Sequence, residues 1–484
     1  MSEQAKRPFD KPQPVWLAAL PLLVLLAVFC AGALFTELGG TLVVVAILLA
    51  ALVAGGIGFS RGIRWQQMEA SAVAKFGDVF PVVLILLSIG GLIGSWMLCG
   101  TIPFFVWLGI YLIDPGYLYV SAFLAAALMS IFTGSSWASA GTIGVALMGL
   151  ATVMDASLAI TAGAVISGAC FGDKMSPLSD STNISAIAAQ ANLYEHIGHM
   201  VYTALPSFLL ALLVFLLVPL SPTGAQNDAI AATAAMQALI EDAFAPAWWQ
   251  LLPPALVILA ITQKWPPVLG ITYSTLLALI LAVAFRPFSL DDAVMAYLHG
   301  FSVDMLPTAI QLKAQANEAF LQLVERGGLY SMVGTLVVII AAFLLAGAMQ
   351  ASGGLNVLIQ AMLKQVKGVF SLILSTMLSG VTLLSLTSHG GVTSLIVGNL
   401  YQQAYQAKRL APVNLSRSIE DSVTLMDPVL PWTVSGLFMA STLGVATIDY
   451  MPWALFCWGG PLFSLMLAAF FSQTRAIRAA RQIN

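Results

Sequence analysis

The sequence predicts an all-α, polytopic membrane protein, and three observations carry that prediction. Of the 484 residues, 59% are hydrophobic and only 8% are charged, whereas a soluble domain has roughly 25% charged residues. Long apolar runs follow one another along nearly the whole chain. Several runs are broken by glycine, proline and hydroxyl-bearing residues, which is typical of an inverted-repeat secondary transporter with broken helices or re-entrant segments.

A membrane helix crosses about 30 Å of hydrocarbon and takes about 20 apolar residues to do so. By that measure the sequence predicts about 11–13 membrane segments, several of them short enough to be half-helices. The apolar runs cover residues 15–36, 39–60, 80–98, 117–133, 134–154, 157–171, 201–220, 249–263, 267–286, 331–351, 368–386, 428–447 and 451–472.

The distribution of charge predicts the orientation of the chain. Basic residues gather after the second run and after the last one, and loops rich in Lys and Arg stay in the cytoplasm. We therefore expect two cytoplasmic tails, residues 1–14 and 474–484. Residues 221–248 carry carboxylates but no Lys or Arg, which favours an extracytoplasmic linker. Residues 288–330 are mixed and amphipathic, which is typical of a segment along the membrane interface.

The chain also looks duplicated, with a first repeat over residues 15–220 and a second over residues 249–473. Corresponding polar breaks in two halves are the best sequence indication of a transporter's binding site. Four short matches follow the same order in both halves: residues 21–28 with 254–261, 94–100 with 347–353, 133–137 with 387–391, and 179–181 with 420–422.

The polar cluster at residues 172–183 is the most informative segment. Asp173, Lys174 and Asp180 lie here beside Pro177, and ionised groups at membrane depth are costly and are usually functional. Pro177 disfavours a continuous helix, so we expect a kinked or unwound stretch. The alternative is a structural ion pair at a helix end. Oxygen ligands of the kind that suit Na⁺ come from Asp180, Ser181, Thr182 and Asn183.

A second acidic cluster at residues 416–424 is expected to be the counterpart of the first. Glu420 and Asp421 are adjacent, so on a helix their side chains diverge by about 100°. One of them is expected to face the site and the other to face Arg417. Thr424 adds a hydroxyl at the end of this cluster.

Two further interruptions contain small residues. Residues 133–142 include Trp137 and Ser139, and their hydroxyls either ligate a cation or only allow close helix packing. His389 and Gly390 precede hydroxyl-bearing residues, as at a half-helix N-terminus that favours an anion, although a structural histidine is the alternative. Candidates for a substrate-binding or pH-sensing role are His389, Gly390, Arg417 and Trp137. The remaining histidines, His196 and His199, are expected on a solvated surface.

Taken as they stand, these motifs resemble the NhaC family of bacterial sodium/proton antiporters, within the larger ion-transporter superfamily. The resemblance rests on residues 134–142, 172–183, 415–421 and 428–432, and it extends over essentially the full chain. It implies an inverted-repeat fold in which the positions facing the ion are Asp180, Thr182, Asn183, Glu420 and Asp421.

The expected function is therefore exchange of Na⁺ for H⁺ across the bacterial inner membrane by alternating access. Na⁺ and a proton would compete for a partly dehydrated carboxylate, with Asp180, Asn183 and Asp421 as the Na⁺ ligands. This hypothesis depends on Asp180 and Asp421 meeting at the centre of the bilayer. No cofactor is expected beyond the transported Na⁺ and H⁺.

Three alternatives remain open from the sequence. The first is a Na⁺- or H⁺-coupled carrier of a small organic anion, malate-like or lactate-like, or of an amino acid. An ion channel is the second. A membrane-embedded enzyme is disfavoured because no nucleophile, base and orienting group can be assembled from the spacing. The net charge of −3 gives no indication of a nucleic-acid partner; the expected partners are the lipid bilayer, the ions and a second copy in a homodimer.

Overall fold

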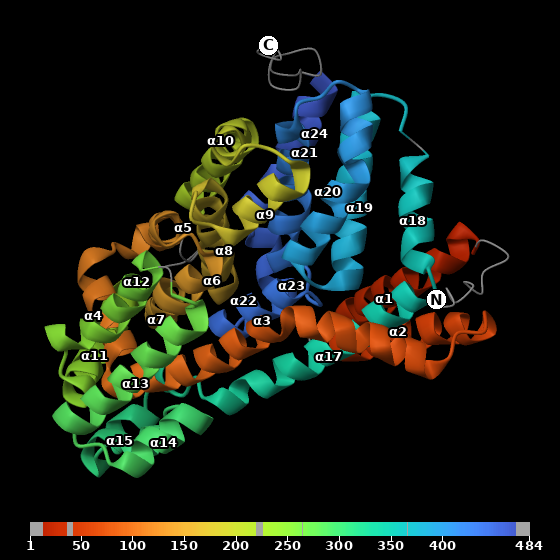
Figure 1. The fold of residues 1–484 in the computed structure, drawn as a ribbon. Coiled ribbons are helices and arrows are strands. Elements are labelled where there is room, and N and C mark those ends of the chain that lie inside the picture. Colours follow the sequence, from red (N-terminus) through yellow and green to blue (C-terminus); the bar gives the residue numbers. More distant parts are fainter. Residues whose placement is uncertain (1–12, 36–41, 219–225, 264, 365, 471–484) are drawn as a thin grey trace.

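A computed structural model describes residues 13–35, 42–218, 226–263, 265–364 and 366–470 (Figure 1). The two predicted cytoplasmic tails, residues 1–14 and 474–484, lie almost wholly outside the described residues. Helices make up nearly all the regular structure of the part that is described. The predicted linker at residues 221–248 is itself helical over α11 (Gln226–Phe244).

The described residues of the first half form ten α-helices, and a π-helical turn at Ala140–Gly144 joins two of them. They are α1 (Val15–Phe35), α2 (Leu42–Ser60), α3 (Trp65–Cys99), α4 (Thr101–Leu112), α5 (Leu118–Thr133), α6 (Ser136–Ser139), α7 (Val145–Val153), α8 (Leu158–Met175), α9 (Asp180–Ala189) and α10 (Leu193–Leu217).

The second half follows α11 and contains a second π-helical turn, at Glu420–Thr424. Its α-helices are α12 (Leu252–Thr262), α13 (Pro267–Phe285), α14 (Leu290–His299), α15 (Thr308–Gln315), α16 (Glu318–Val324), α17 (Val333–Ala351), α18 (Gly354–Leu363), α19 (Val369–Thr387), α20 (Gly390–Ala407), α21 (Pro412–Ile419), α22 (Val434–Leu443), α23 (Thr447–Tyr450) and α24 (Leu455–Phe470).

The apolar helices are suited to a membrane. Seven helices of the described ranges are long and apolar enough to cross a bilayer, and the total reaches 11 if each of four bent pairs counts as one span. That upper total meets the lower end of the predicted range. One bent pair joins α3 to α4 at 68°, and another joins the α21 segment to α22 at 45°. The prediction of an all-helical membrane protein with broken helices is therefore confirmed.

The repeat is visible in where the helices end. Gly100, which ends α3 and begins α4, and Gly353, which lies two residues after α17 and begins α18, both adopt left-handed backbone. Left-handed residues also end α5 and α19, at Gly134 and Ser388. These two pairs correspond to two of the four sequence matches.

One of the four matches is wrong. Asp173 and Asp427 are separated by 254 positions (427 minus 173), and the same spacing relates the ten-residue helices α9 and α22. In this register Asp180 corresponds to Val434, whereas the Glu420–Asp421 pair corresponds to Ile166 and Ser167. The acidic segments 179–181 and 420–422 are therefore not equivalent positions, since short clusters of similar residues align by composition alone.

The two halves are intertwined. α2 packs on α17 and α13 packs on α3, so each long helix is covered by a helix from the other half (Figure 1). The short helices α14–α16 occupy the predicted interfacial segment at residues 288–330. They separate α13 from α17, where the first half passes directly from α2 to α3.

The most extensive helix contact joins α5 and α8. A Cβ added at Gly168 would lie 2.1 Å from the carbonyl oxygen of Phe123, and one added at Gly172 would lie 2.5 Å from that of Ala127. Only glycine permits this approach of two backbones. The close contact fixes the end of α8, where the first polar cluster begins.

Candidate functional site

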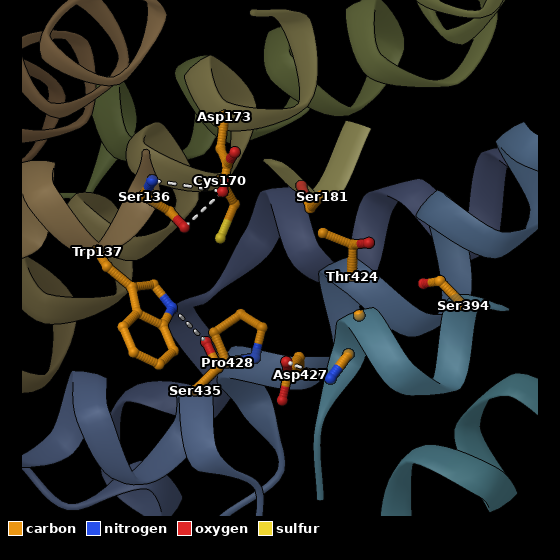
Figure 2. A pocket seen from close by; sticks show the side chains of 12 residues that line it. Ser136, Trp137, Cys170, Asp173, Ser181, Ser394, Thr424, Asp427, Pro428 and Ser435 are labelled. Atoms are coloured by element: carbon orange, nitrogen blue, oxygen red, sulfur yellow. Dashed lines mark hydrogen bonds between the residues drawn. The ribbon is translucent and has the colours of Figure 1, made fainter. Parts of the chain in front are cut away.

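A cavity lies where the interrupted helices of the two halves meet (Figure 2). It offers about 90 Å³ to the centres of water-sized molecules, and one water needs roughly 10–15 Å³ by that measure. A partly hydrated ion therefore fits. The lining residues are Ser136, Trp137, Cys170, Asp173, Ser181, Gly390, Gly391, Ser394, Thr424, Asp427, Pro428 and Ser435.

The first half contributes a helix N-terminus and a carboxylate to the cavity. Gly134 breaks the chain after α5, and Ser135 caps α6 by accepting a hydrogen bond from the Ala138 amide. Asp173, near the end of α8, accepts from the Ser136 amide at 3.3 Å and from its hydroxyl at 2.6 Å. The Ser179 hydroxyl donates to the other oxygen of Asp173. Both carboxylate oxygens of Asp173 are therefore hydrogen-bonded.

The second half repeats this arrangement with one difference. His389 caps α20 because its Nδ1 accepts from the Val392 amide at 3.3 Å. Asp427 Oδ2 accepts from the Gly390 amide at 3.2 Å. Its Oδ1 is buried and has no hydrogen bond of normal geometry within the described part of the chain, although the Thr433 hydroxyl and the Ser435 amide lie near the carboxylate. Asp173 thus accepts well-formed hydrogen bonds at both oxygens, whereas Asp427 does so at one.

The rest of the cavity wall is aromatic and hydroxyl-bearing. Trp137 stacks on Phe438 with ring centroids 4.3 Å apart, and its Nε1 donates to the Ser435 hydroxyl at 3.2 Å. Figure 2 shows Asp173 and Asp427 on opposite sides of the space, with Ser181 and Thr424 between them. Carboxylate and hydroxyl oxygens are the ligands that a hard cation prefers. Among the described residues no three His, Cys, Asp or Glu side chains form a metal cluster.

A separate, fully buried charge cluster lies beside the cavity. Lys174 of α8 forms a salt bridge with Asp421 of the π-helical turn. The Thr203 hydroxyl of α10 donates to the same carboxylate at 3.1 Å, and Arg417 Nε lies 3.7 Å from its second oxygen. The prediction that one acidic residue faces Arg417 is confirmed for Asp421.

Glu420, the neighbour of Asp421, has a different environment. Its side chain is fully buried next to the hydroxyls of Ser185 and Thr424. Neither of its carboxylate oxygens makes a hydrogen bond of normal geometry within the described part of the chain. The adjacent carboxylates therefore point to different neighbours, as the helical geometry predicts.

The structure does not bring the predicted Na⁺ ligands together. Asp180 begins α9 with an exposed side chain, whereas Asp421 is fully buried against Lys174, so the two carboxylates do not share one buried site. Asn183 donates its amide to the carbonyls of residues 177 and 179. The expected meeting of Asp180 and Asp421 is therefore wrong, because the α9 N-cap turns Asp180 away from the charge cluster.

The other predicted residues divide between cavity, charge cluster and backbone support. Ser181, Thr424, Trp137 and Gly390 line the cavity with Asp173. Thr182 donates to the carbonyls of Asp173 and Lys174, and Ser139 donates to that of Ser135. Arg417 does not line the cavity; it is buried with Asp421.

The sequence analysis missed several residues of the site, and Asp427 and His196 are the most informative of them. Asp427 carries a signal that the sequence offered, because Asp173 and Pro177 recur with the same spacing as Asp427 and Pro431. His196, expected on a solvated surface, is instead fully buried with its Nδ1 2.7 Å from the Ser416 hydroxyl. That contact joins α10 to α21, which no local pattern indicates.

An all-helical membrane protein whose broken helices meet at a carboxylate-lined cavity has the architecture of an ion-coupled secondary transporter. Residues 168–470 match the model of the Na⁺/H⁺ antiporter family, and the chain belongs to that family. The match therefore covers the whole described second half of the chain, and in the first half it includes the end of α8, where Asp173 lies.

Similar proteins span nearly the whole chain. An uncharacterized Na⁺/H⁺ antiporter of Haemophilus influenzae is 40% identical over 87% of this chain and 89% of its own length. The Na⁺/H⁺ antiporter NhaC of Alkalihalophilus pseudofirmus is 33% identical over 94% of this chain and 96% of its own. The malate-2H⁺/Na⁺-lactate antiporter of Bacillus subtilis is 28% identical over 89% of this chain and 90% of its own.

Proposed function

We propose that this chain exchanges Na⁺ for H⁺ across the bacterial inner membrane by alternating access, as a carrier and not as an enzyme. The observation that carries the proposal is the cavity of about 90 Å³ that Asp173 and Asp427 both line, where Asp173 accepts well-formed hydrogen bonds at both oxygens and Asp427 at one. Membership of the Na⁺/H⁺ antiporter family supports the same ions.

The proposed binding of Na⁺ at Asp427 follows from the different hydrogen bonds that Asp173 and Asp427 accept. Asp173 accepts hydrogen bonds at both oxygens, so its charge is held by the N-terminus of α6 and by Ser179. Asp427 accepts from the Gly390 amide through Oδ2, and its Oδ1 has no hydrogen bond of normal geometry within the described residues. A rotation of the side chain would turn Oδ1 to the cavity as a ligand. Na⁺ would bind there with help from the Thr424 and Ser435 hydroxyls of the wall.

Exchange requires that the empty site does not cross the membrane. A cavity with two carboxylates and no cation carries uncompensated charge, which is costly to move through a low-dielectric region. Occupation by Na⁺, or protonation, reduces that charge and permits the halves to reorient. Alternation of the two loaded forms then yields antiport.

The orientation belongs to the same proposal. Arg61 and Arg64 follow α2, and basic loops stay in the cytoplasm. Both termini would then be cytoplasmic, with the α11 segment on the opposite side. Reagents that label only the outer surface should reach a cysteine placed in α11.

One alternative has a specific observation in its favour. The malate-2H⁺/Na⁺-lactate antiporter is similar over most of the chain, and helix N-termini such as those of α6 and α20 attract anions. In this chain, however, Asp173 and Asp427 already occupy both N-termini. An organic anion would have to displace a carboxylate or bind beside one.

Transport by purified protein in lipid vesicles tests the proposal. An imposed ΔpH should drive uptake of radioactive Na⁺, without malate or lactate present. Asp427→Asn should lower that uptake at least tenfold, while the control Asp449→Asn, at an exposed position of α23, should leave it unchanged. Uptake that needs an organic acid would establish the alternative, and full activity of Asp427→Asn would remove Asp427 from the mechanism.

A further inference from the structure

We propose that Glu420 carries the exchanged proton, at a position separate from the cavity that holds Na⁺. This inference rests on the proposed Na⁺/H⁺ exchange and assigns the two ions to different side chains. It differs from simple competition of Na⁺ and H⁺ for one carboxylate.

The first argument is the environment of Glu420. The side chain is fully buried, and neither carboxylate oxygen has a hydrogen bond of normal geometry among the residues described; the Ser185 and Thr424 hydroxyls lie near enough for a weaker interaction. An ionised carboxylate buried without hydrogen bonds is very costly, whereas a neutral carboxylic acid is far less so. Glu420 therefore holds a proton in this conformation.

The second argument is that two hydroxyl groups lie close enough to donate hydrogen bonds to Glu420 when it is ionised. Ser185 of α9 is fully buried next to Glu420, and its hydroxyl makes no hydrogen bond of normal geometry with a described residue. Thr424, at the end of the π-helical turn that Glu420 begins, also lies near the carboxylate. A small rotation of Glu420 would supply both hydroxyls to a carboxylate, so the same place accommodates both protonation states.

The third argument is the link to the cavity. Thr424 lies next to Glu420 and also lines the cavity. Glu420 and Thr424 begin and end one π-helical turn, an irregularity found frequently at functional sites. A proton that leaves Glu420 has a hydroxyl to pass to, and beyond it is the space that holds water or Na⁺.

Charge couples the two positions. The charged and titratable groups near Glu420 are Lys174 and Asp173 of α8. Lys174 also pairs with Asp421, which in turn lies 3.7 Å from Arg417 of α21, and Tyr405 of α20 acts on Arg417. Na⁺ in the cavity adds a positive charge near Glu420, and a positive neighbour favours the ionised carboxylate. Arrival of Na⁺ therefore expels the proton, and arrival of the proton weakens Na⁺ binding.

Vesicle transport in two modes tests the assignment. Glu420→Gln keeps the neutral form, so ΔpH-driven Na⁺ uptake should fall at least tenfold. Exchange of radioactive Na⁺ for unlabelled Na⁺ at equal pH should persist at saturating Na⁺, with a raised KM because the side chain mimics the proton-loaded state. Asp427→Asn should lose both modes. The control Glu195→Gln changes an exposed glutamate of α10 and should lose neither.

The outcomes separate this inference from the proposed function. Wild-type protein without ΔpH-driven Na⁺ uptake would end both. Active wild-type protein with a fully active Glu420→Gln variant would overturn the inference alone, as would a folded variant that loses both modes. Ser185→Ala provides a second measurement if Glu420→Gln fails to fold.

Ser185→Ala removes a donor that the ionised Glu420 needs. A hydrogen bond to a charged group contributes about 1.5–3 kcal/mol, so deprotonation should need a more alkaline pH by about one pH unit or more. The pH profile of Na⁺/H⁺ exchange should move by that amount, with Na⁺/Na⁺ exchange at saturating Na⁺ retained. An unmoved profile would contradict the assignment.

Discussion

The Lys174–Asp421 salt bridge gives the sharpest prediction about stability. It joins α8 of the first half to the π-helical turn of the second, and both side chains are fully buried. Asp421 also accepts from Thr203 and lies near Arg417. The Asp421 carboxylate therefore neutralises two cations, Lys174 and Arg417. Removing Asp421 should for that reason cost more stability than removing Lys174.

The arrangement fixes the order of the effects. Breaking a buried ion pair from one side costs about 3–5 kcal/mol because the remaining charge is left uncompensated. Lys174→Met leaves Asp421 with Arg417 and Thr203, so its cost should lie at the lower end of that range. Asp421→Asn leaves Lys174 and Arg417 without their shared carboxylate, so its cost should reach the upper end or exceed it.

The double variant Lys174→Met/Asp421→Asn tests whether the two cations repel each other once the carboxylate is lost. In the Asp421→Asn background, Lys174 repels Arg417, so adding Lys174→Met should recover part of the lost stability. Equilibrium unfolding in mixed detergent micelles, followed by tryptophan fluorescence, measures all three variants against wild type. A double variant less stable than Asp421→Asn, or Lys174→Met costing more than Asp421→Asn, would refute this account of the cluster.

Two further predictions concern the frame of the site. Gly168→Ala should lower the midpoint of thermal unfolding, because its Cβ would lie 2.1 Å from the carbonyl of Phe123, whereas Gly198→Ala meets nothing within 4 Å and should not lower it. His389→Leu should cost about 1 kcal/mol through loss of the α20 cap to Val392, and His389→Asn, which still offers an acceptor, should cost less; equal costs for the two variants would contradict the capping role.

Much of the fold follows from composition and local chemistry. The shortage of charge and the length of the apolar runs predict a membrane protein of broken helices. The breaks are also predictable, because Gly134 ends α5 and Pro177 precedes the start of α9. The end of α19 at Ser388, which adopts left-handed backbone, is harder to predict because serine rarely adopts that conformation. Only the alignment of Ser388 with Gly134 indicates that a helix ends there.

The site is harder to predict, because contacts between distant helices decide it. Asp180 and Asp173 lie in one short segment, yet Asp173 lines the cavity and Asp180 is exposed. The cause is local: Ser179 caps α9, which places Asp180 at its first turn. Lys174 is adjacent to Asp173 in the sequence, yet its salt-bridge partner is Asp421, 247 residues away.

The unequal surroundings of Asp173 and Asp427 are beyond any sequence argument, because the two residues occupy matching positions. Each accepts a hydrogen bond from the first turn of a broken helix, through Ser136 and Gly390. They differ because Ser179 donates to the Asp173 carboxylate, whereas the matching Thr433 donates to the backbone carbonyl of Asp427 and lies near its carboxylate without a hydrogen bond of normal geometry. Two similar halves in different conformations are what a cavity with alternating access requires. The weaker hydrogen bonding of Asp427 Oδ1 is therefore a property of this conformation of its half, and not of the aspartate alone.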